Sequence, residues 1–326
     1  MRVIVELMRT PPDDLDPRAL ARVLGDEWGF EAVDLDHVPL GFGSHHWRAT
    51  DASGARRFVT VDDLGAGEAG TREVRLARLA RALETAGWLR DRHGLEFVVA
   101  PLPPASGAVP TTVGERWAAT VFPWLEVGTE AVSAATALDL LVAMHSATGH
   151  PPAVRDDLVL QDRHAIDRAM AELDAPWSGG PYSEPARRAL AAVELSVRAA
   201  LERYDASAAA IIRAGEPWVV THGEPKAGNL VETSDGPKLV DWDTALVAPA
   251  ARDLCMLDDA VVERYRRLTG RAVPATELDF YRLRWDLTDI SSYVPWFRRP
   301  HSVDADLQIA WTAFSGLLAP GGSSTI

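Results

Sequence analysis

Three polar side chains in the middle of the chain have the types and spacing needed to hold a divalent cation beside a proton acceptor. Glu224 lies in Thr221-His222-Gly223-Glu224, Asn229 follows five residues later, and Asp241 follows twelve residues after that. Carboxylate and amide oxygens bind Mg²⁺, and a neighbouring carboxylate can accept a proton from a hydroxyl. This spacing indicates a site where metal binding and proton transfer occur together.

A short hairpin is expected to bring the two metal ligands together. Strand-like runs at 229–231 and 238–240 flank the turn Asp235-Gly236-Pro237. Asn229 and Asp241 would then lie on neighbouring strands, so that both oxygens can reach one cation. The loop that precedes this hairpin carries the proposed proton acceptor.

The order of these residues is that of a kinase catalytic loop. That loop reads H-R-D-x-x-x-x-N and is followed by a metal-binding Asp at a strand end. Phosphoryl transfer depends on charge neutralisation and alignment more than on covalent chemistry. Glu224 would accept the hydrogen bond of the attacking hydroxyl, Asn229 and Asp241 would hold Mg²⁺, and His222 would buttress the loop. Each residue alone has an ordinary structural explanation, and the ordered set favours the kinase interpretation.

The rest of the chain changes character near residue 125. Before it, strand-like runs at 33–38, 45–50 and 57–62 predict an antiparallel meander, followed by an amphipathic helix from Thr71 and two further strands at 96–102 and 115–124. After Gly128, helical spacing dominates at 133–147, 185–204 and 276–297. The sequence predicts an α+β fold with two lobes: a β-rich N-lobe over residues 1–125 and a larger, mostly helical C-lobe over residues 126–326.

The catalytic segment resembles the aminoglycoside phosphotransferase family, whose relatives include the choline and fructosamine kinases. Those loops typically read H-G-D-x-x-x-x-N and their next strand ends in D-W-D or D-W-E, which His222-Gly223, Asn229 and Asp241-Trp242-Asp243 match. Arg252-Asp253-Leu254 continues the likeness, with an Asp that is mainly structural in the family. The resemblance implies a two-lobed, protein-kinase-like fold, Mg²⁺, and ATP or GTP as the co-substrate.

The resemblance also suggests where the nucleotide binds. Gly41-Phe42-Gly43-Ser44, between two strands, looks like the loop over the phosphates, with Gly41, Gly43 and Ser44 in contact, although G-x-G turns are common. Phe122-Pro123-Trp124-Leu125 resembles the hinge that holds the adenine, and Phe122 and Trp124 are its candidate nucleotide-binding residues. A plain edge strand with a proline explains this segment equally well. His145, on the apolar face of helix 133–147, is interpreted as a hydrogen-bonded core histidine.

Two positions depart from the family. Glu224 stands where the base is normally Asp, which keeps a carboxylate with one more methylene. The third strand of a kinase carries a Lys that grips the α- and β-phosphates, and Thr60 stands about there in this chain. No Lys precedes Lys226, so Lys226 is the expected substitute, with Arg48 or Arg57 as alternatives.

Composition excludes several classes of function. Lys and Arg number 33 against 47 Asp and Glu, and the formal charge of −14 disfavours nucleic acid and anionic membranes as partners. The single cysteine, Cys255, excludes an internal disulfide and a cysteine-rich zinc site. No apolar run approaches the ~20 residues of a membrane span, and the first residues do not resemble a signal peptide. We expect a cytoplasmic protein.

These observations predict an ATP- or GTP-dependent O-phosphotransferase acting on a small hydroxylated molecule. An aminoglycoside-like antibiotic is the favoured acceptor, because an acidic surface attracts a polycation. Asp243, Asp286 and Asp289 are the candidate acceptor-binding residues, although a solvated acidic face also explains the last two. A sugar or amino-alcohol metabolite stays open as the acceptor.

Two alternatives to the enzyme remain. The missing Lys favours a pseudokinase or a binding module that uses the same cleft. A metal hydrolase built on His222 and the two Asp of Asp241-Trp242-Asp243 lacks a second His at metal-ligand spacing. The sequence does not indicate an oligomeric state.

Overall fold

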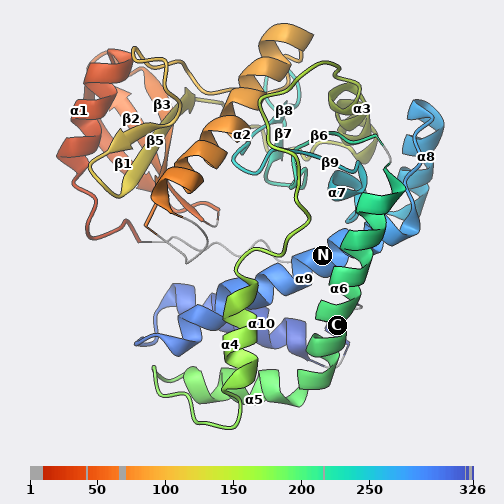
Figure 1. The fold of residues 1–326 in the computed structure, drawn as a ribbon. Helices are drawn as coiled ribbons and strands as arrows, with labels where there is room; N and C mark the ends of the chain where they lie inside the picture. The colour runs from red at the N-terminus through yellow and green to blue at the C-terminus, as the bar shows by residue number, and fades with distance from the viewer. Residues whose placement is uncertain (1–9, 42, 66–70, 216, 320, 323–324) are drawn as a thin grey trace.

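The structure is a computed structural model of the 326-residue chain, and it describes residues 10–41, 43–65, 71–215, 217–319, 321–322 and 325–326. A β-sheet flanked by helices α1 and α2 lies beside a larger, mostly helical part (Figure 1). The predicted α+β class is confirmed. The boundary near residue 125 stays a prediction, although the last strand of the sheet ends at Pro123 and the next helix begins at Ala134.

A five-stranded antiparallel sheet in the order β1-β2-β3-β5-β4 forms the N-terminal part. Its strands are β1 (Ala32–Val38), β2 (Ser44–Asp51), β3 (Arg56–Asp63), β4 (Thr111–Val113) and β5 (Trp117–Pro123). Alternation in β2 and β3 buries Trp47, Ala49, Val59 and Val61 in one cluster with Leu20 and Leu24 of α1 (Pro17–Trp28). The predicted meander is therefore confirmed.

The other face of the sheet is turned toward the catalytic segment. Ser44 Oγ donates to Asp62 Oδ1 at 2.6 Å, and His46 stacks on Phe58 with ring centroids 5.2 Å apart. Phe58 also packs in a small apolar cluster with residues from β5, α2, the segment that follows α2, and the C-terminal part, which are Phe122, Leu83, Val99 and Val240. Val240 directly precedes Asp241, so this cluster ties the sheet to the predicted metal site.

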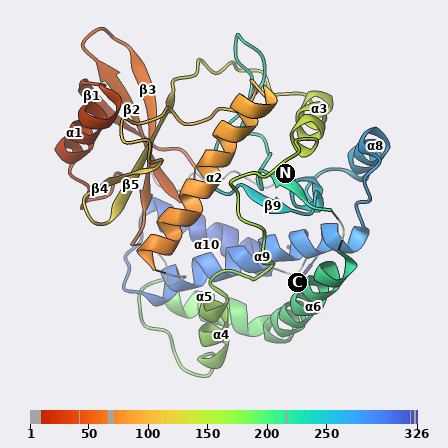
Figure 2. The ribbon, with the colours of Figure 1, turned by 45° about the horizontal axis from the view of Figure 1, so that its top comes forward.

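Helix α2 (Arg72–His93) begins where the sequence predicts it. The Thr71 side chain accepts a hydrogen bond from the backbone N–H of Val74, and Gly94 ends the helix in the left-handed region. Its buried residues are Ala82, Leu83, Thr85, Ala86 and Leu89. Figure 2 shows α2 running between the sheet and the C-terminal part, so residues of this helix can reach the cleft from the side of the small lobe.

The predicted strand at 96–102 is wrong. It is an extended segment with a single bridge, from Val98 to Leu239, and Val99 N–H donates to the Leu239 carbonyl at 3.0 Å. Pro101 then removes a backbone donor that a strand would need. β4, which takes the edge of the sheet instead, is a strand that the sequence analysis does not predict. The segment 96–102 pairs with β8 of the catalytic hairpin, and its backbone reaches the sheet through a hydrogen bond from the Leu102 N–H to the Val121 carbonyl at 2.7 Å.

The C-terminal part packs its helices around one large apolar core. The helices are α3 (Ala134–His145), α4 (Arg163–Ala171), α5 (Ser183–Ala192), α6 (Glu194–Ala214), α7 (Ala251–Leu254), α8 (Asp259–Thr269), α9 (Ala275–Arg298) and α10 (Ala305–Leu318). Two small antiparallel pairs lie among them: β6 (Val219–Thr221) with β9 (Leu246–Ala248), and β7 (Leu230–Val231) with β8 (Lys238–Leu239). These pairs carry the catalytic segment.

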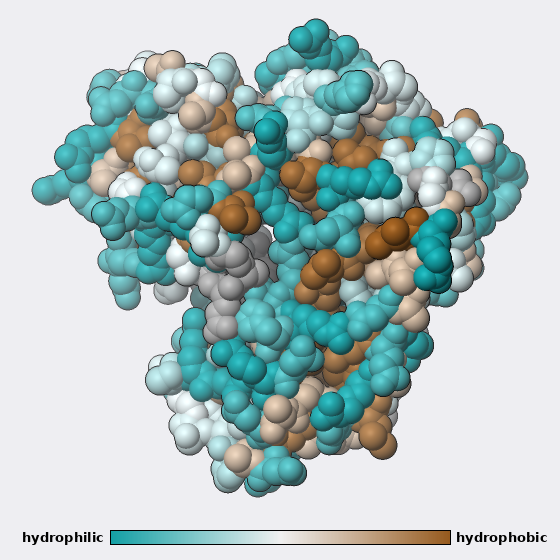
Figure 3. Space-filling model, viewed as in Figure 1, coloured by the Kyte–Doolittle hydropathy of each residue, from teal (hydrophilic) through white to brown (hydrophobic). Residues whose placement is uncertain are grey.

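The surface is mainly polar. Figure 3 shows one face of the molecule as largely hydrophilic, with small hydrophobic patches between polar side chains. Among the described helices, none combines the length and apolar character that a membrane crossing requires.

Candidate active site

A buried carboxylate fixes the backbone of the catalytic loop. Asp253 accepts hydrogen bonds from the N–H groups of His222 at 2.9 Å and Gly223 at 2.6 Å. Burial disfavours its charge, but a hydrogen bond from His145 and the nearby positive groups hold the pKa of Asp253 below its ordinary value. Asp253 is therefore structural, as the resemblance implies, and it sets the position of the loop.

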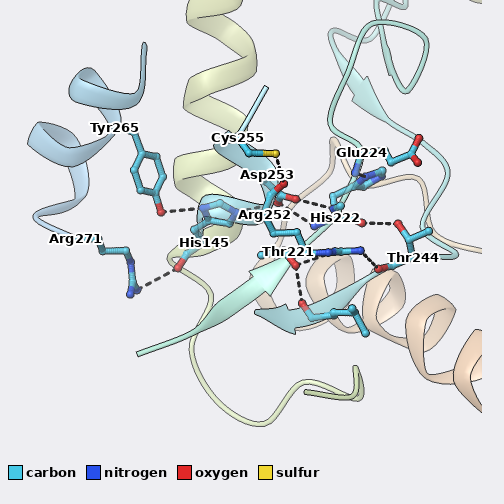
Figure 4. A network of polar contacts seen from close by, with 12 residues as sticks. His145, Thr221, His222, Glu224, Thr244, Arg252, Asp253, Cys255, Tyr265 and Arg271 are labelled. Atoms are coloured by element: carbon cyan, nitrogen blue, oxygen red, sulfur yellow. Dashed lines mark hydrogen bonds and ion pairs between the residues drawn. The ribbon is translucent and has the colours of Figure 1, made fainter. Parts of the chain in front are cut away.

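A second layer of side chains holds Asp253 in turn. His145 is buried, with Nε2 at 3.0 Å from Asp253 and Nδ1 at 2.8 Å from the Tyr265 hydroxyl. The interpretation of His145 as a hydrogen-bonded core residue is thereby confirmed. Figure 4 shows this chain of contacts, and the Glu224 side chain leaving it and pointing away from the buried groups.

Arg252 stabilises the loop through hydrogen bonds to residues on two neighbouring segments. Its guanidinium donates to Thr221 Oγ1 at 3.0 Å and to the Thr244 carbonyl at 2.8 Å. Gly223 has a φ of 102°, and a Cβ there would collide with this guanidinium. The Gly of the motif is thus required both by the backbone conformation and by the close approach of Arg252.

His222 acts as the predicted buttress. Its ring lies 2.8 Å from the Val240 carbonyl through Nε2, and Nδ1 accepts from the Glu224 N–H at 3.2 Å. Burial lowers the pKa of His222, so a neutral ring with the proton on Nε2 fits both contacts. The ring also packs edge-on against Trp242, with centroids 4.8 Å apart. His222 therefore links the loop to the strand end before Asp241.

Asn229 and Asp241 flank the β7–β8 hairpin as the sequence predicts. The N–H of Val240 donates to the Asn229 carbonyl at 2.9 Å, which brings the two ends of the hairpin together. The Asn229 amide nitrogen donates to the Glu224 carbonyl at 3.0 Å, so its oxygen is the atom that could ligate a cation. Asp241 has a φ of 70°, a strained conformation that is characteristic of functional positions.

Carboxylates gather around Asp241. Burial, followed by the charge of Glu224, raises the pKa of Asp241. Burial and the charges of Asp241 and Asp62 raise the pKa of Asp243 well above its ordinary value. One carboxylate and one amide oxygen are a donor set that Mg²⁺ accepts when phosphates and water complete its shell, and the negative charge would favour such a cation. The residues present therefore fit the implied metal.

Glu224 and Lys226 form an ion pair at the mouth of the site. Lys226 Nζ lies 2.6 Å from Glu224 Oε2, and the two side chains are 54% and 28% exposed. Lys226 Nζ also lies over the Trp285 ring, 5.6 Å from its centroid. The lysine is therefore close to the proposed base, where the sequence places it.

A cavity of about 360 Å³ opens beside the loop. Glu224, Asp243 and Thr244 form its floor, and α9 contributes Trp285 and Thr288 to its wall. The cavity is large enough for a small polar molecule next to the proposed base.

The two acidic residues predicted on α9 do not line this cavity. Asp286 is buried and accepts a hydrogen bond from the Thr325 hydroxyl, which places it on a different face of α9 from Trp285 and Thr288. Asp289 is half-buried. Of the acceptor-binding residues proposed from the sequence, Asp243 is the one that the structure brings to the cavity.

Of the proposed nucleotide residues, Ser44, Thr60 and Phe122 share the face of the sheet that carries Phe58 and Asp62. Gly41 and Gly43 have φ values of 70° and 101°, and Phe42 lies outside the described residues. Thr60 pairs across the strands with His46 and Thr120. Phe122 belongs to the apolar cluster described above, whereas Trp124 carries the Arg56 guanidinium 5.0 Å above its ring.

The two arginines considered as substitutes for the missing Lys have other partners. Arg48 pairs with Asp36 at the edge of the sheet, and the Arg57 guanidinium lies 5.3 Å from the centroid of the Phe30 ring, in the cluster under α1. Neither side chain lines the cavity.

Sequence reasoning missed several polar residues at the cleft. Asp62 follows Thr60 by two residues and so shares its face of β3, a signal that the sequence did contain. Arg78 and Gln161 meet across the cavity, and Asp162 lines it with Oδ1 buried and without a hydrogen-bond partner in the described part of the chain. These contacts join parts of the chain that are distant in sequence, and no local sequence pattern predicts them.

Comparison with known proteins agrees with this geometry. The fold is that of the protein-kinase-like phosphotransferases. The sequence pattern of the phosphotransferase enzyme family matches residues 34–289, and the chain belongs to that family. It is also 30% identical over 312 residues to Protein StrN of Streptomyces griseus, covering 90% of this chain and 89% of that protein. The predicted family is confirmed.

Solved structures share the fold at low sequence identity. A spectinomycin phosphotransferase in complex with ADP and spectinomycin has a TM-score of 0.63 and 13% identity, covering 92% of this chain and 98% of its own. An ethanolamine kinase of Plasmodium vivax has a TM-score of 0.53 and 10% identity, covering 93% and 88%. At these identities the likeness shows the architecture.

Proposed function

We propose that the protein is an ATP- or GTP-dependent O-phosphotransferase that acts on a hydroxyl group of a small molecule. The carrying observation is that Glu224 lies on the floor of a cavity and its backbone carbonyl accepts from the side chain of Asn229, which flanks the same hairpin as Asp241. A proton acceptor, a cation-binding pair and an acceptor-sized cavity therefore meet at one loop.

The residues divide the transfer between them. Glu224 accepts the proton of the acceptor hydroxyl as its oxygen bonds to the γ-phosphorus. The bond from that phosphorus to the β–γ bridging oxygen breaks, and the nucleoside diphosphate leaves with the electron pair. His222 and Asp253 hold the loop so that Glu224 needs little reorganisation.

Asn229 and Asp241 would hold Mg²⁺, which supplies charge neutralisation for the phosphates when bound. The nucleotide would lie against the cleft face of the sheet, with Gly41, Gly43 and Ser44 near the phosphates. Phe122 and Trp124 would lie at the adenine end. Support comes from the spectinomycin phosphotransferase, which shares the fold and was solved with ADP.

We infer an aminoglycoside-like acceptor as the first candidate. The carboxylates of Glu224, Asp243 and Asp162 line the cavity and suit amino groups. The relative that was solved with spectinomycin supports this choice. A sugar or amino-alcohol metabolite is the second candidate, and the ethanolamine kinase with the same fold supports it.

One observation favours a catalytically weakened binding module. β3 presents Thr60 and the carboxylate Asp62 to the cleft, where a kinase presents a Lys. A negative group beside the triphosphate weakens nucleotide binding unless another cation offsets it.

The test begins with calorimetric titration of ATP and GTP, with and without Mg²⁺. Phosphorylation is then measured over a panel of aminoglycosides, sugars and amino alcohols, with Asp241→Asn as the inactive control. Asp241-dependent transfer to any member of the panel supports the enzyme. Nucleotide binding with no transfer and no hydrolysis would support the binding module instead.

A further inference from the structure

The positively charged side chains at the cavity differ in what they are paired with. Arg284 donates to the buried carboxylate of Asp156 at 2.6 Å. Arg252 is committed to Thr221 and Thr244 beneath the loop. Among the described residues that line the cavity, this leaves Arg78 as the cation whose hydrogen-bond partner, Gln161, is neither a carboxylate nor part of the catalytic loop.

Arg78 reaches the cavity from helix α2 of the small lobe. It is half-buried and precedes Ala82, Thr85 and Leu89 at helical spacing, so it lies on the packed face of the helix. When the Gln161 amide is turned so that its oxygen rather than its nitrogen faces Arg78, that oxygen accepts hydrogen bonds from both terminal nitrogens of the guanidinium, from Nη2 at 2.9 Å. The guanidinium thus bridges the small lobe to the segment that precedes α4.

The charges of the small lobe are reversed relative to a protein kinase. There, a Lys on the third strand pairs with a Glu on the following helix. Here, the strand carries Asp62 at the cleft and the following helix carries Arg78. A cation is retained on the wall that faces the catalytic loop, but it comes from the helix.

We propose that Arg78 is the small-lobe catalytic residue that meets the γ-phosphoryl group during transfer. This inference rests on the proposed phosphotransferase function. As the bond from the acceptor oxygen to phosphorus forms and the bond to the bridging oxygen breaks, negative charge spreads over the other oxygens of the γ-phosphoryl. The Arg78 guanidinium lines the same cavity as Glu224 and can donate two hydrogen bonds to those oxygens.

The present partner of Arg78 makes this exchange favourable. Gln161 is a neutral amide, so replacing it by a phosphate oxygen gains a charge–charge interaction without separating an ion pair. Lys226, in contrast, must weaken its contact with Glu224 before it can reach a phosphate. The two cations are therefore expected to act at different points: Lys226 at the base, Arg78 at the transferred group.

The test compares Arg78→Ala and Arg78→Lys with Arg81→Ala. Arg81 is an exposed arginine of the same helix whose ion pair is with Glu84, at 3.8 Å, so it controls for lost helix charge. Turnover is measured with an active acceptor or, without one, as Asp241-dependent nucleotide hydrolysis. Mg-nucleotide affinity is measured by calorimetry, and thermal melting confirms folding.

We expect Arg78→Ala to lower kcat on the order of 10²–10³-fold and to change the Kd of the Mg-nucleotide by less than about threefold. Arg78→Lys should keep an intermediate rate, and Arg81→Ala should match the wild type. Added guanidinium ion should restore about tenfold of the lost rate in Arg78→Ala and none in Glu224→Gln.

An Arg78→Ala protein with kcat within threefold of the wild type would overturn the inference and leave the phosphotransferase intact. So would a loss confined to KM for the acceptor, because that places the guanidinium on the acceptor rather than on the phosphoryl group. A wild-type protein without any Asp241-dependent turnover would overturn the proposed function, and this inference with it.

Discussion

The two walls of the cleft are built in opposite ways. On the wall of the large lobe, the polar groups of the loop are paired: Asp253 binds two backbone N–H groups, and His222 uses both ring nitrogens. On the wall of the small lobe, His46 Nδ1, Thr120 Oγ1 and Trp124 Nε1 are buried without hydrogen-bond partners in the described ranges. The loop is thus paired without a ligand, whereas the described part of the small-lobe wall has unpaired donors and acceptors, as does Asp162 beside the cavity on the large-lobe side.

We expect this difference to divide the roles of the two walls, with the loop serving phosphoryl transfer and the unpaired groups serving nucleotide binding. A paired, buried loop holds its groups in place before the reaction, which is how an enzyme limits reorganisation in the transition state. Each unpaired buried polar group costs on the order of 1–3 kcal/mol, so a nucleotide that satisfies such groups gains binding energy. We therefore expect substitutions in the large-lobe loop, and at Arg78 on α2, to affect turnover, and substitutions in the sheet of the small lobe to affect nucleotide affinity or stability.

The largest effect is expected from Asp241→Asn. A neutral ligand cannot hold Mg²⁺ against the triphosphate, so turnover should be abolished while the fold remains. Asn229→Ala should weaken Mg-nucleotide binding. Steady-state assays, calorimetry and thermal melting check these outcomes, and near-normal turnover in a folded Asp241→Asn protein would remove the basis for the kinase assignment.

The second effect tests the base. Glu224→Gln should lower kcat on the order of 10²–10⁴-fold, because the amide cannot accept the acceptor proton. Nucleotide affinity should hardly change, since Glu224 lines the acceptor cavity. Glu224→Asp should retain much of the activity. If Glu224→Gln loses nucleotide binding and keeps its turnover, the carboxylate has been assigned to the wrong substrate.

Local patterns were enough to predict most of the wall that carries the proposed catalytic residues. The loop, the hairpin and the Arg252-Asp253 support lie within one continuous segment, and residue order fixes their relations. The meander and the cap at Thr71 are likewise local features. The strands, the hairpin and the cap are decided by contacts between residues that are near in sequence or paired by a short turn, whereas the Asp253 support spans 31 residues to His222 and was expected from the family resemblance.

Long-range contacts explain what the sequence did not predict. The segment 96–102 has strand-like residues, but it bridges β8 at Val98 and reaches the sheet through a backbone hydrogen bond from Leu102 to Val121. Arg78 meets Gln161 only because α2 packs across the cleft. Asp286 and Asp289 are three residues apart on one helix, which suggested a shared acidic site. Asp286 instead accepts a hydrogen bond from Thr325, which is 39 residues away in the sequence. Spacing within one helix cannot reveal such partners.

The third effect concerns the missing Lys. Lys226→Ala should lower kcat by about 10–10²-fold with little change in nucleotide Kd, because its charge acts mainly in the transition state. Thr60→Ala should change little, and Thr60→Lys should tighten nucleotide binding. Steady-state kinetics with calorimetry on the three variants checks this, and a Lys226→Ala protein that matches the wild type would assign the compensating charge to the small lobe alone.

The smallest effect is a change in stability at the small-lobe wall. Burial, with a contribution from the charge of Asp241, raises the pKa of Asp62 to about 6 from an ordinary 3.8. A raised carboxyl pKa means that the folded state binds the proton more tightly than the unfolded state, so stability falls as pH rises from about 4 through 6. Asp62→Asn, which keeps an acceptor for Ser44, should therefore melt on the order of 2–4 °C higher than the wild type at pH 7.5 and equally at pH 4.

Asp26→Asn, which removes an exposed charge from α1, should show no such pH-dependent difference. Melting curves of the three proteins across this range decide the matter, and an Asp62→Asn protein that is less stable at pH 7.5 would mean that the hydrogen bond to Ser44 outweighs the cost of the buried charge.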